Sequence, residues 1–230
     1  MPDTSQKKPN VAVVLSGCGV FDGSEIHEAV FTLHAIDKSG ASYQCFAPDI
    51  AQTHVFDHLK GEVAEGETRN VLVESARIAR GDIKPLSEFD AAAFDAIAFP
   101  GGFGSAKNLS SFAFDAAECT VNGDVERVIK DMVAAEKPIA ALCISPVLMA
   151  KVLDGADLTI GQNEGVAAAI EDMGAHHSPT GHVGIVIDPK YKLVTAPCYM
   201  LESTISQIAD GAYAAIEALL AIVEDGKAVR

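Results

Sequence analysis

Cys143 lies where an apolar strand-like segment meets a helix-like one, in the sequence PIAALCISPVLMAKVLD at residues 138–154. The run before it is apolar at every position, which is typical of a strand buried between helix layers. Ser145 can cap a helix, and Pro146 suits the first helical position. A cysteine in such a turn projects out of the sheet, and the helix N-terminus favours its thiolate. The alternative is a small buried hydrophobic residue.

Two other glycine-containing loops are expected near this thiol. One follows an apolar run at residues 11–16, and the other, beginning PGGFG, follows an apolar run at 94–99. In open parallel sheets, the functional crevice lies beyond the carboxyl ends of the strands. The Gly17–Ser24 loop, the Gly101–Gly102 pair and Cys143 are therefore predicted to meet there.

The elements that must position these residues alternate between strands and helices. Predicted strands lie at residues 11–16, 42–47, 94–99, 138–142 and 158–160, with a hairpin at 183–187 and 192–196, and predicted helices lie at 24–39, 70–80, 125–135, from 145, 166–173 and 203–223. Residues 49–70 are expected to be an irregular excursion. This alternation predicts an α/β fold, a three-layer αβα sandwich with a doubly wound, mainly parallel sheet.

Length and composition bound the remaining possibilities. The chain has 230 residues and is 49% hydrophobic, so we expect a polar tail at residues 1–10 and one domain at 11–230. The net charge of −15 disfavours nucleic acid and anionic membranes as partners. We find no apolar run of membrane-spanning length. Five widely spaced cysteines fit reduced thiols in the cytoplasm better than a disulfide framework or a metal site.

Several separated motifs together resemble one family. They are SGCGVFDGSEIHEAVFTL, TRNVLVESARIARG, PGGFGSAKNLS, AALCISP and DLTIG. In this order they resemble the ElbB branch, the enhancing-lycopene-biosynthesis proteins, of the PfpI superfamily of class I glutamine amidotransferase-like proteins. The resemblance covers nearly the whole chain and implies a flavodoxin-like fold.

The resemblance also implies roles for site residues. The family cysteine falls on Cys143, and the glutamate held close to its sulfur falls on Glu28. Glu25 lies on the same helix face three residues earlier and is the alternative partner. For either glutamate, the simpler role is to complement the helix dipole. The backbone amides of Gly102 and Ile144 would form an oxyanion hole.

Three further residues are expected near the same pocket, namely Gly101, Asn108 and Cys18. Asn108 has the alternative of an ordinary turn or cap, and Cys18 that of packing in a tight loop.

The sequence departs from the wider superfamily in its histidines. Ile144 stands where peptidase-like members carry histidine, Gly161 stands where a deglycase branch carries one, and no histidine has glutamate two positions later. A Cys-His triad for proteolysis or glutamine hydrolysis is therefore not expected. His177, with its neighbour His176, is the main remaining candidate for a base, and His182 is a weaker one.

The resemblance implies a glutathione-independent glyoxalase that converts glyoxal or methylglyoxal to glycolate or lactate. It would need no cofactor, and we expect a small dicarbonyl substrate, a homodimer and a cytoplasmic protein. Two alternatives are kept, namely a cysteine redox sensor or scaffold linked to isoprenoid metabolism, and a partner-dependent amidotransferase-like subunit. The loop GCGVFDG lacks the G-x-G-x-x-G spacing of a dinucleotide site.

Overall fold

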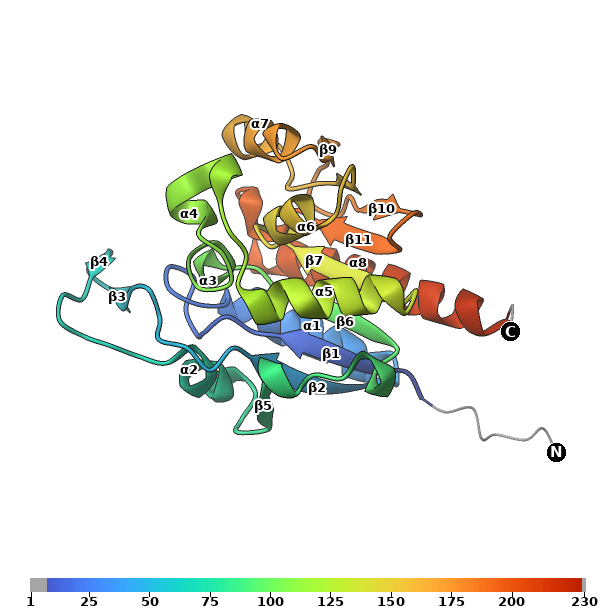
Figure 1. Cartoon of the computed structure of the whole chain (residues 1–230), viewed down its shortest axis with the longest axis horizontal. Helices are drawn as coiled ribbons and strands as arrows, with labels where there is room; N and C mark the ends of the chain where they lie inside the picture. The colour runs from blue at the N-terminus through green and yellow to red at the C-terminus, as the bar shows by residue number, and fades with distance from the viewer. Residues whose placement is uncertain (1–7, 229–230) are drawn as a thin grey trace.

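The central sheet and its helices account for most of the chain. The computed structural model describes residues 8–228. The main strands are β1 (Asn10–Val14), β2 (Ser42–Ala47), β5 (Ile83–Pro85), β6 (Ala96–Phe99), β7 (Ile139–Leu142), β10 (Val186–Asp188) and β11 (Leu193–Ala196). The α-helices are α1 (Ile26–Lys38), α2 (Val71–Ile78), α3 (Phe103–Lys107), α4 (Phe112–Asp115), α5 (Gly123–Ala134), α6 (Pro146–Val152), α7 (Glu164–Asp172) and α8 (Ile205–Ala228). Figure 1 shows their arrangement.

The sheet has the order β10-β11-β7-β6-β1-β2-β5, and every pairing except β10 with β11 is parallel. The strands β6 and β7 are buried at every position, as their continuous apolar sequences require. The strand order reverses beside β1, which pairs with both β2 and β6. The prediction of a doubly wound, mainly parallel α/β sheet is therefore confirmed.

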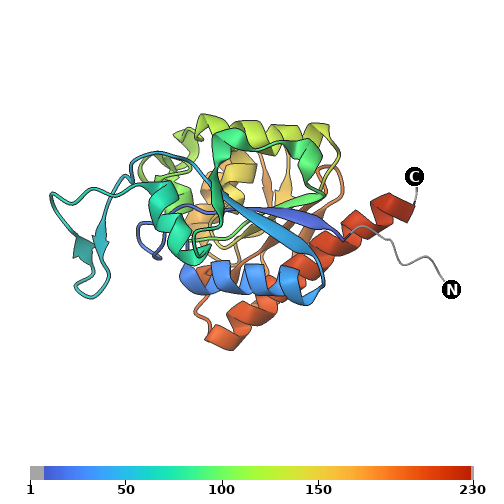
Figure 2. The same ribbon diagram turned by 90° about the horizontal axis from the view of Figure 1, so that it is seen from below.

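Helices cover both faces of this sheet. The helices α1 and α8 pack together on one face, and α5 lies on the other (Figure 2). Within α8, the segment Ile205–Gly226 is long and apolar enough by length and composition to cross a membrane. It also packs against β7, β11 and α1, which is usual for a core helix of this kind.

The structure differs from the sequence expectations mainly in the connections. The segment 49–70 contains a small hairpin of β3 (Phe56–Asp57) and β4 (Glu62–Val63), which projects from the body of the protein (Figures 1 and 2). The loop predicted after residue 99 instead contains α3 and α4. Residues 1–7 of the predicted polar tail lie outside the described residues, and β1 already begins at Asn10.

A second small sheet pairs β8 (Asp157–Leu158) with β9 (His176–His177) in parallel. Short 3-10 helices occupy Leu86–Glu88, Ala91–Ala93, Ala116–Glu118 and Cys198–Met200. The last of these follows β11 directly, and so it lies at the same sheet edge as the loops after β1, β6 and β7.

Candidate functional site

Backbone hydrogen bonds connect the loops that follow neighbouring strands. The Cys143 amide, after β7, donates to the Ala196 carbonyl at the end of β11 at 2.9 Å. The Glu25 amide, before α1, donates to the Gly101 carbonyl after β6, also at 2.9 Å. The first bond joins the ends of β7 and β11, and the second joins the loop after β1 to the end of β6.

Cys143 occupies a strained turn between β7 and α6. Its φ is +61°, in the left-handed region that residues other than glycine rarely adopt. The buried Ser145 side chain holds this turn in place. Its Oγ donates to the Pro100 carbonyl at 2.7 Å and lies 2.8 Å from Ser105 Oγ. The side chain of Cys143 is therefore directed by the backbone, as expected for a nucleophile at an elbow.

Glu28 is fully buried on the first turn of α1. Its Oε1 accepts a hydrogen bond from the Tyr199 amide at 3.0 Å, while Oε2 has no hydrogen-bond partner among the described residues. Burial raises the pKa of Glu28 from its ordinary value of 4.5 to about 8, against the opposing effect of the Tyr199 amide. The carboxyl group is therefore mostly protonated at neutral pH.

Glu25 has a different position. It caps the N-terminus of α1, and its Oε2 accepts a hydrogen bond from the Glu28 amide at 2.7 Å. Glu25 also lines the cavity described below. Of the two glutamates, Glu28 neighbours the Cys143 sulfur, and Glu25 positions Glu28 through the hydrogen bond from its amide.

Gly101 forms the floor between the thiol and the carboxyl group. A Cβ atom at this position would lie closer than 3.0 Å to Cys143 Cβ, Cys143 Sγ and Glu28 Oε2. The thiol and the carboxyl group thus occupy the space that any larger residue would need. The next residue, Gly102, has a φ of +105°, and its backbone amide lies within hydrogen-bonding reach of the Cys143 sulfur.

The protonation state of Cys143 differs from the sequence expectation of a thiolate. Burial raises the pKa of the thiol well above its ordinary value, and the neighbouring Glu28 carboxyl raises it further. The Gly102 amide acts in the opposite direction, but it is a smaller effect. Burial therefore outweighs the N-terminus of the short helix α6, and the resting sulfur is a thiol.

A cavity of about 390 Å³ opens onto Cys143, Gly102 and Ile144. Its walls are mostly apolar and come from α3, α4, α7 and the loops between strands and helices. They include Val20, Phe103, Phe112, Val166 and Met200. Small-molecule sites are usually concave and apolar with a few polar groups, and this cavity has that character.

The predicted histidine bases do not reach this cavity. His177 lies on β9, where its Nε2 is buried without a partner and burial lowers the pKa of the ring. His176 lies beside it on the same small sheet. The Nδ1 of His182 lies 3.0 Å from Ser203 Oγ. Among the residues that the structure describes, no histidine lines the cavity, and His177 lies on the small sheet of β8 and β9, apart from Cys143.

Asn108 is not in the cavity lining either. Its Nδ2 donates to the carbonyls of Ser16 and Asp22 at 2.9 and 2.8 Å, and its Oδ1 accepts from the Thr53 amide at 3.0 Å. It therefore joins the loop after β1 to the 49–70 segment behind the site.

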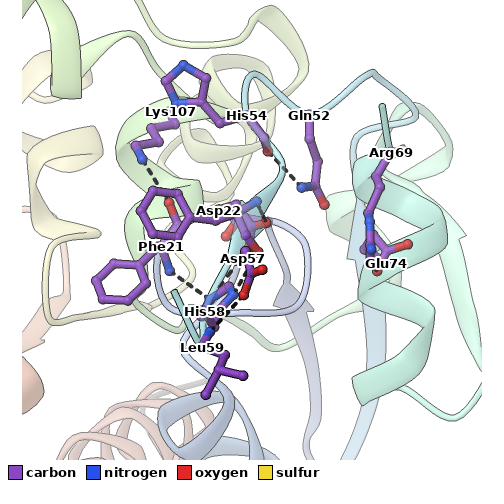
Figure 3. Close-up of polar contacts among 12 residues, drawn as sticks. Phe21, Asp22, Gln52, His54, Asp57, His58, Leu59, Arg69, Glu74 and Lys107 are labelled. Atoms are coloured by element: carbon purple, nitrogen blue, oxygen red, sulfur yellow. Dashed lines mark hydrogen bonds and ion pairs between the residues drawn. The ribbon is translucent and has the colours of Figure 1, made fainter. Parts of the chain in front are cut away.

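The same two segments meet at several other polar contacts (Figure 3). The Phe56 amide donates to Asp22 Oδ2 at 2.8 Å, and the Phe21 amide donates to His58 Nε2 at 3.3 Å. Lys107 of α3 also binds this loop, because its Nζ donates to the Phe21 carbonyl at 2.8 Å. Cys18, also in the loop after β1, neighbours Arg77 and Glu74 of α2 and does not line the cavity. These contacts support the loop and do not involve Cys143 or Glu28.

Two site residues were missed by sequence reasoning. Tyr199 lines the cavity and supplies the amide that binds Glu28, and Cys198 is close enough to raise the pKa of Cys143. Their signal was available, because PCYM directly follows the predicted strand at 192–196. No group of three or more potential metal ligands occurs within residues 8–228.

Sequence comparisons identify close relatives. No protein-family model matches the chain. The human glutamine amidotransferase-like class 1 domain-containing protein 3, mitochondrial, is 51% identical over 219 residues, covering 91% of this chain and 82% of that protein. The rat ES1 protein homolog, mitochondrial, is 49% identical over 222 residues, covering 93% and 84%. Both names contradict the expectation of a cytoplasmic protein.

Solved structures give the same relationship. An isoprenoid biosynthesis protein with an amidotransferase-like domain from Ehrlichia chaffeensis has a TM-score of 0.86 and 34% identity, covering 93% of this chain and 99% of that one. A ThiJ/PfpI domain protein from Brachyspira murdochii shares the fold alone, with a TM-score of 0.58 and 18% identity over 94% and 98%. The chain belongs to the ES1 family of proteins with a glutamine amidotransferase-like class 1 domain.

Proposed function

We propose that this protein is an ElbB-like, cofactor-independent glyoxalase of mitochondria that converts glyoxal or methylglyoxal to glycolate or lactate. One observation carries the proposal. The strained Cys143 faces a cavity beside a buried carboxyl group, Glu28, whose Oε2 has no partner among the described residues. The likeness to the Ehrlichia isoprenoid biosynthesis protein supports the ElbB-like assignment.

The first step joins the thiol to the substrate. The ionised form of Glu28 accepts the thiol proton as Cys143 Sγ bonds to the aldehyde carbon, and the amides of Gly102 and Ile144 stabilise the resulting oxyanion. Glu28 then returns the proton to that oxygen, which gives a neutral hemithioacetal. A carboxyl pKa near 8 suits this exchange because the group both accepts and donates protons near neutral pH.

The second step moves hydrogen between adjacent carbons. Glu28 removes the proton from the former aldehyde carbon, which gives an enediol, and delivers it to the neighbouring carbon. The hydroxyl proton of the former aldehyde carbon passes to the oxygen of that neighbouring carbon, and the product is a thioester. Water then hydrolyses the thioester, releasing the α-hydroxy acid and the Cys143 thiol. The aldehyde carbon is oxidised and the ketone or second aldehyde carbon is reduced, so no external oxidant is required.

Replacement of Cys143 tests the proposal. The wild-type protein should convert methylglyoxal to lactate without glutathione or metal, and Cys143→Ser and Cys143→Ala should lose this activity entirely. Lactate is measured after incubation of each purified protein with methylglyoxal. Cys119→Ser, on a buried thiol outside the cavity lining, is the matched control and should retain the activity. An undiminished rate in the Cys143 variants would contradict the mechanism.

A redox sensor is the second candidate function. Protonated Glu28 and the Gly102 amide could donate hydrogen bonds to oxygen atoms on an oxidised Cys143 sulfur. The raised thiol pKa argues against rapid oxidation, because peroxide reacts with the thiolate. Mass spectrometry after mild peroxide treatment distinguishes the two functions, since selective Cys143 oxidation without dicarbonyl turnover favours the sensor.

A further inference from the structure

We propose that the cavity over Cys143 selects neutral α-oxoaldehydes with a bulky apolar substituent over both methylglyoxal and anionic analogues. The reaction that follows binding is taken from the proposed function, and this part of the inference rests on it. The order of substrate preference rests on the cavity alone.

The cavity is larger than a small dicarbonyl needs. Its volume of about 390 Å³ falls within the range of roughly 300–1,000 Å³ that is common for sites of drug-sized ligands. Methylglyoxal presents one methyl group to these walls and would leave most of the space to water. A phenyl or branched alkyl substituent would instead fill it and remove apolar surface from water.

The position of the apolar walls fits a substituent attached to a carbonyl at the sulfur. Cys143, Gly102 and Ile144 lie at the same cavity as the rings of Phe103 and Phe112, the thioether of Met200 and the side chain of Val166. Aromatic and thioether groups pack well against an aromatic ring. A substrate whose aldehyde bonds to Cys143 can therefore extend its other end along these side chains.

The charge of the lining excludes anions. Among the described residues, the lining contains the carboxyl group of Glu25 and no lysine, arginine or histidine. Lys107 lies near the wall, with Nζ 5.3 Å from the centre of the Phe103 ring, but its ammonium donates to the Phe21 carbonyl at 2.8 Å and does not line the cavity. A carboxylate or phosphate on the substrate would thus be desolvated without a cationic partner.

The first arm of the test compares substrates. The kcat/KM of the wild-type protein is measured with methylglyoxal, phenylglyoxal and 4-carboxyphenylglyoxal. We expect phenylglyoxal to exceed methylglyoxal by about tenfold or more, since each added apolar group in a fitting pocket contributes on this order. The carboxylated compound should fall below phenylglyoxal by at least a similar factor. Val166→Asp should reduce the phenylglyoxal-to-methylglyoxal ratio, while Val73→Asp, on the exposed face of α2, should preserve it.

The second arm needs no turnover. Rates of Cys143 alkylation by N-benzyl iodoacetamide, iodoacetamide and iodoacetate are followed by mass spectrometry of the Cys143 peptide, and each is normalised to the rate with free N-acetylcysteine. The expected order is benzyl amide, then amide, then acetate. If this order holds without turnover of any oxoaldehyde, the glyoxalase proposal fails and the cavity preference stands. If the normalised rates are equal or reversed, or if turnover favours methylglyoxal, the preference is overturned whatever the activity.

Discussion

The thiol of Cys143 and the carboxyl group of Glu28 are neutral for the same reason, which is that both are buried beside each other over Gly101. Burial is the largest cause of the raised pKa of both groups. The Glu28 carboxyl raises the pKa of Cys143 further, whereas the hydrogen bond from Cys143 lowers the pKa of Glu28. Both groups therefore hold their protons at neutral pH. The sequence suggested a thiolate because Cys143 precedes the N-terminus of α6. The helix α6 is too short for its N-terminus to reverse the effect of burial on the pKa.

The raised pKa of Glu28 makes stability depend on pH. The folded protein keeps a proton that the unfolded chain releases above its ordinary pKa of 4.5, so this contribution is fully present below that value and is lost as pH rises through about 8. Between about pH 5 and about pH 9, the unfolding free energy of the wild type should fall a few kcal/mol more than that of Glu28→Gln. Urea denaturation at each pH measures this. Parallel profiles would contradict the raised pKa.

Gly101→Ala should remove activity and lower stability by about 1–3 kcal/mol, because the added methyl group overlaps both reactive side chains. Thermal and urea unfolding measure the stability, and lactate formation measures the activity. Gly123→Ala is the matched control, since a Cβ at the start of α5 meets no atom within 4 Å. It should be neutral or slightly stabilising.

The sequence predicted some site residues better than others. A small, apolar strand followed by Ser145 and Pro146 was sufficient to predict the turn at Cys143. The resemblance favoured Glu28 and left Glu25 as the alternative, because the two are neighbours on one helix face, and the cap geometry distinguishes them. His177 was predicted as a base from its residue type. Its position depends on β9, a two-residue strand that is too short to show a hydrophobic pattern in the sequence.

At the scale of elements, the hydrophobic pattern of the sequence predicts the strands and the long helices. It does not predict the connections between them. Continuous apolar runs predicted β6 and β7 because both faces of these strands are buried. The helices α3 and α4 are five and four residues long, which is too short for a helical period to be visible in the sequence. The loop after β1 likewise takes its shape from distant partners.

Asn108 provides one of these partners, and its removal should loosen the loop. Asn108→Ala leaves the buried carbonyls of Ser16 and Asp22 and the Thr53 amide without their hydrogen bonds, at a cost of about 1–3 kcal/mol. Amide hydrogen exchange in residues 16–22 should become faster. Asn70→Ala removes the cap of α2 and should cost about 1 kcal/mol without this local effect. Unchanged exchange in the Asn108 variant would show that other contacts hold the loop.

At the scale of the whole molecule, we propose that the protein forms a homodimer through the outer face of α1. Ile26 and Val30 on this helix are 44% and 47% exposed, although α1 packs on its other side against α8. Light scattering after size-exclusion chromatography should give twice the chain mass for the wild type and the chain mass for Val30→Asp. A wild-type monomer would contradict the proposal, and an unchanged Val30→Asp dimer would place the interface elsewhere.

The distribution of the five cysteines affects how the protein responds to general thiol reagents. Cys18 is partly exposed in its loop, whereas the other four, including Cys143, are buried. A charged probe applied to the intact protein will therefore modify Cys18 first. Surveys that rank cysteines by their labelling rate with such a probe would select a supporting loop residue and overlook the sulfur to which we assign the chemistry.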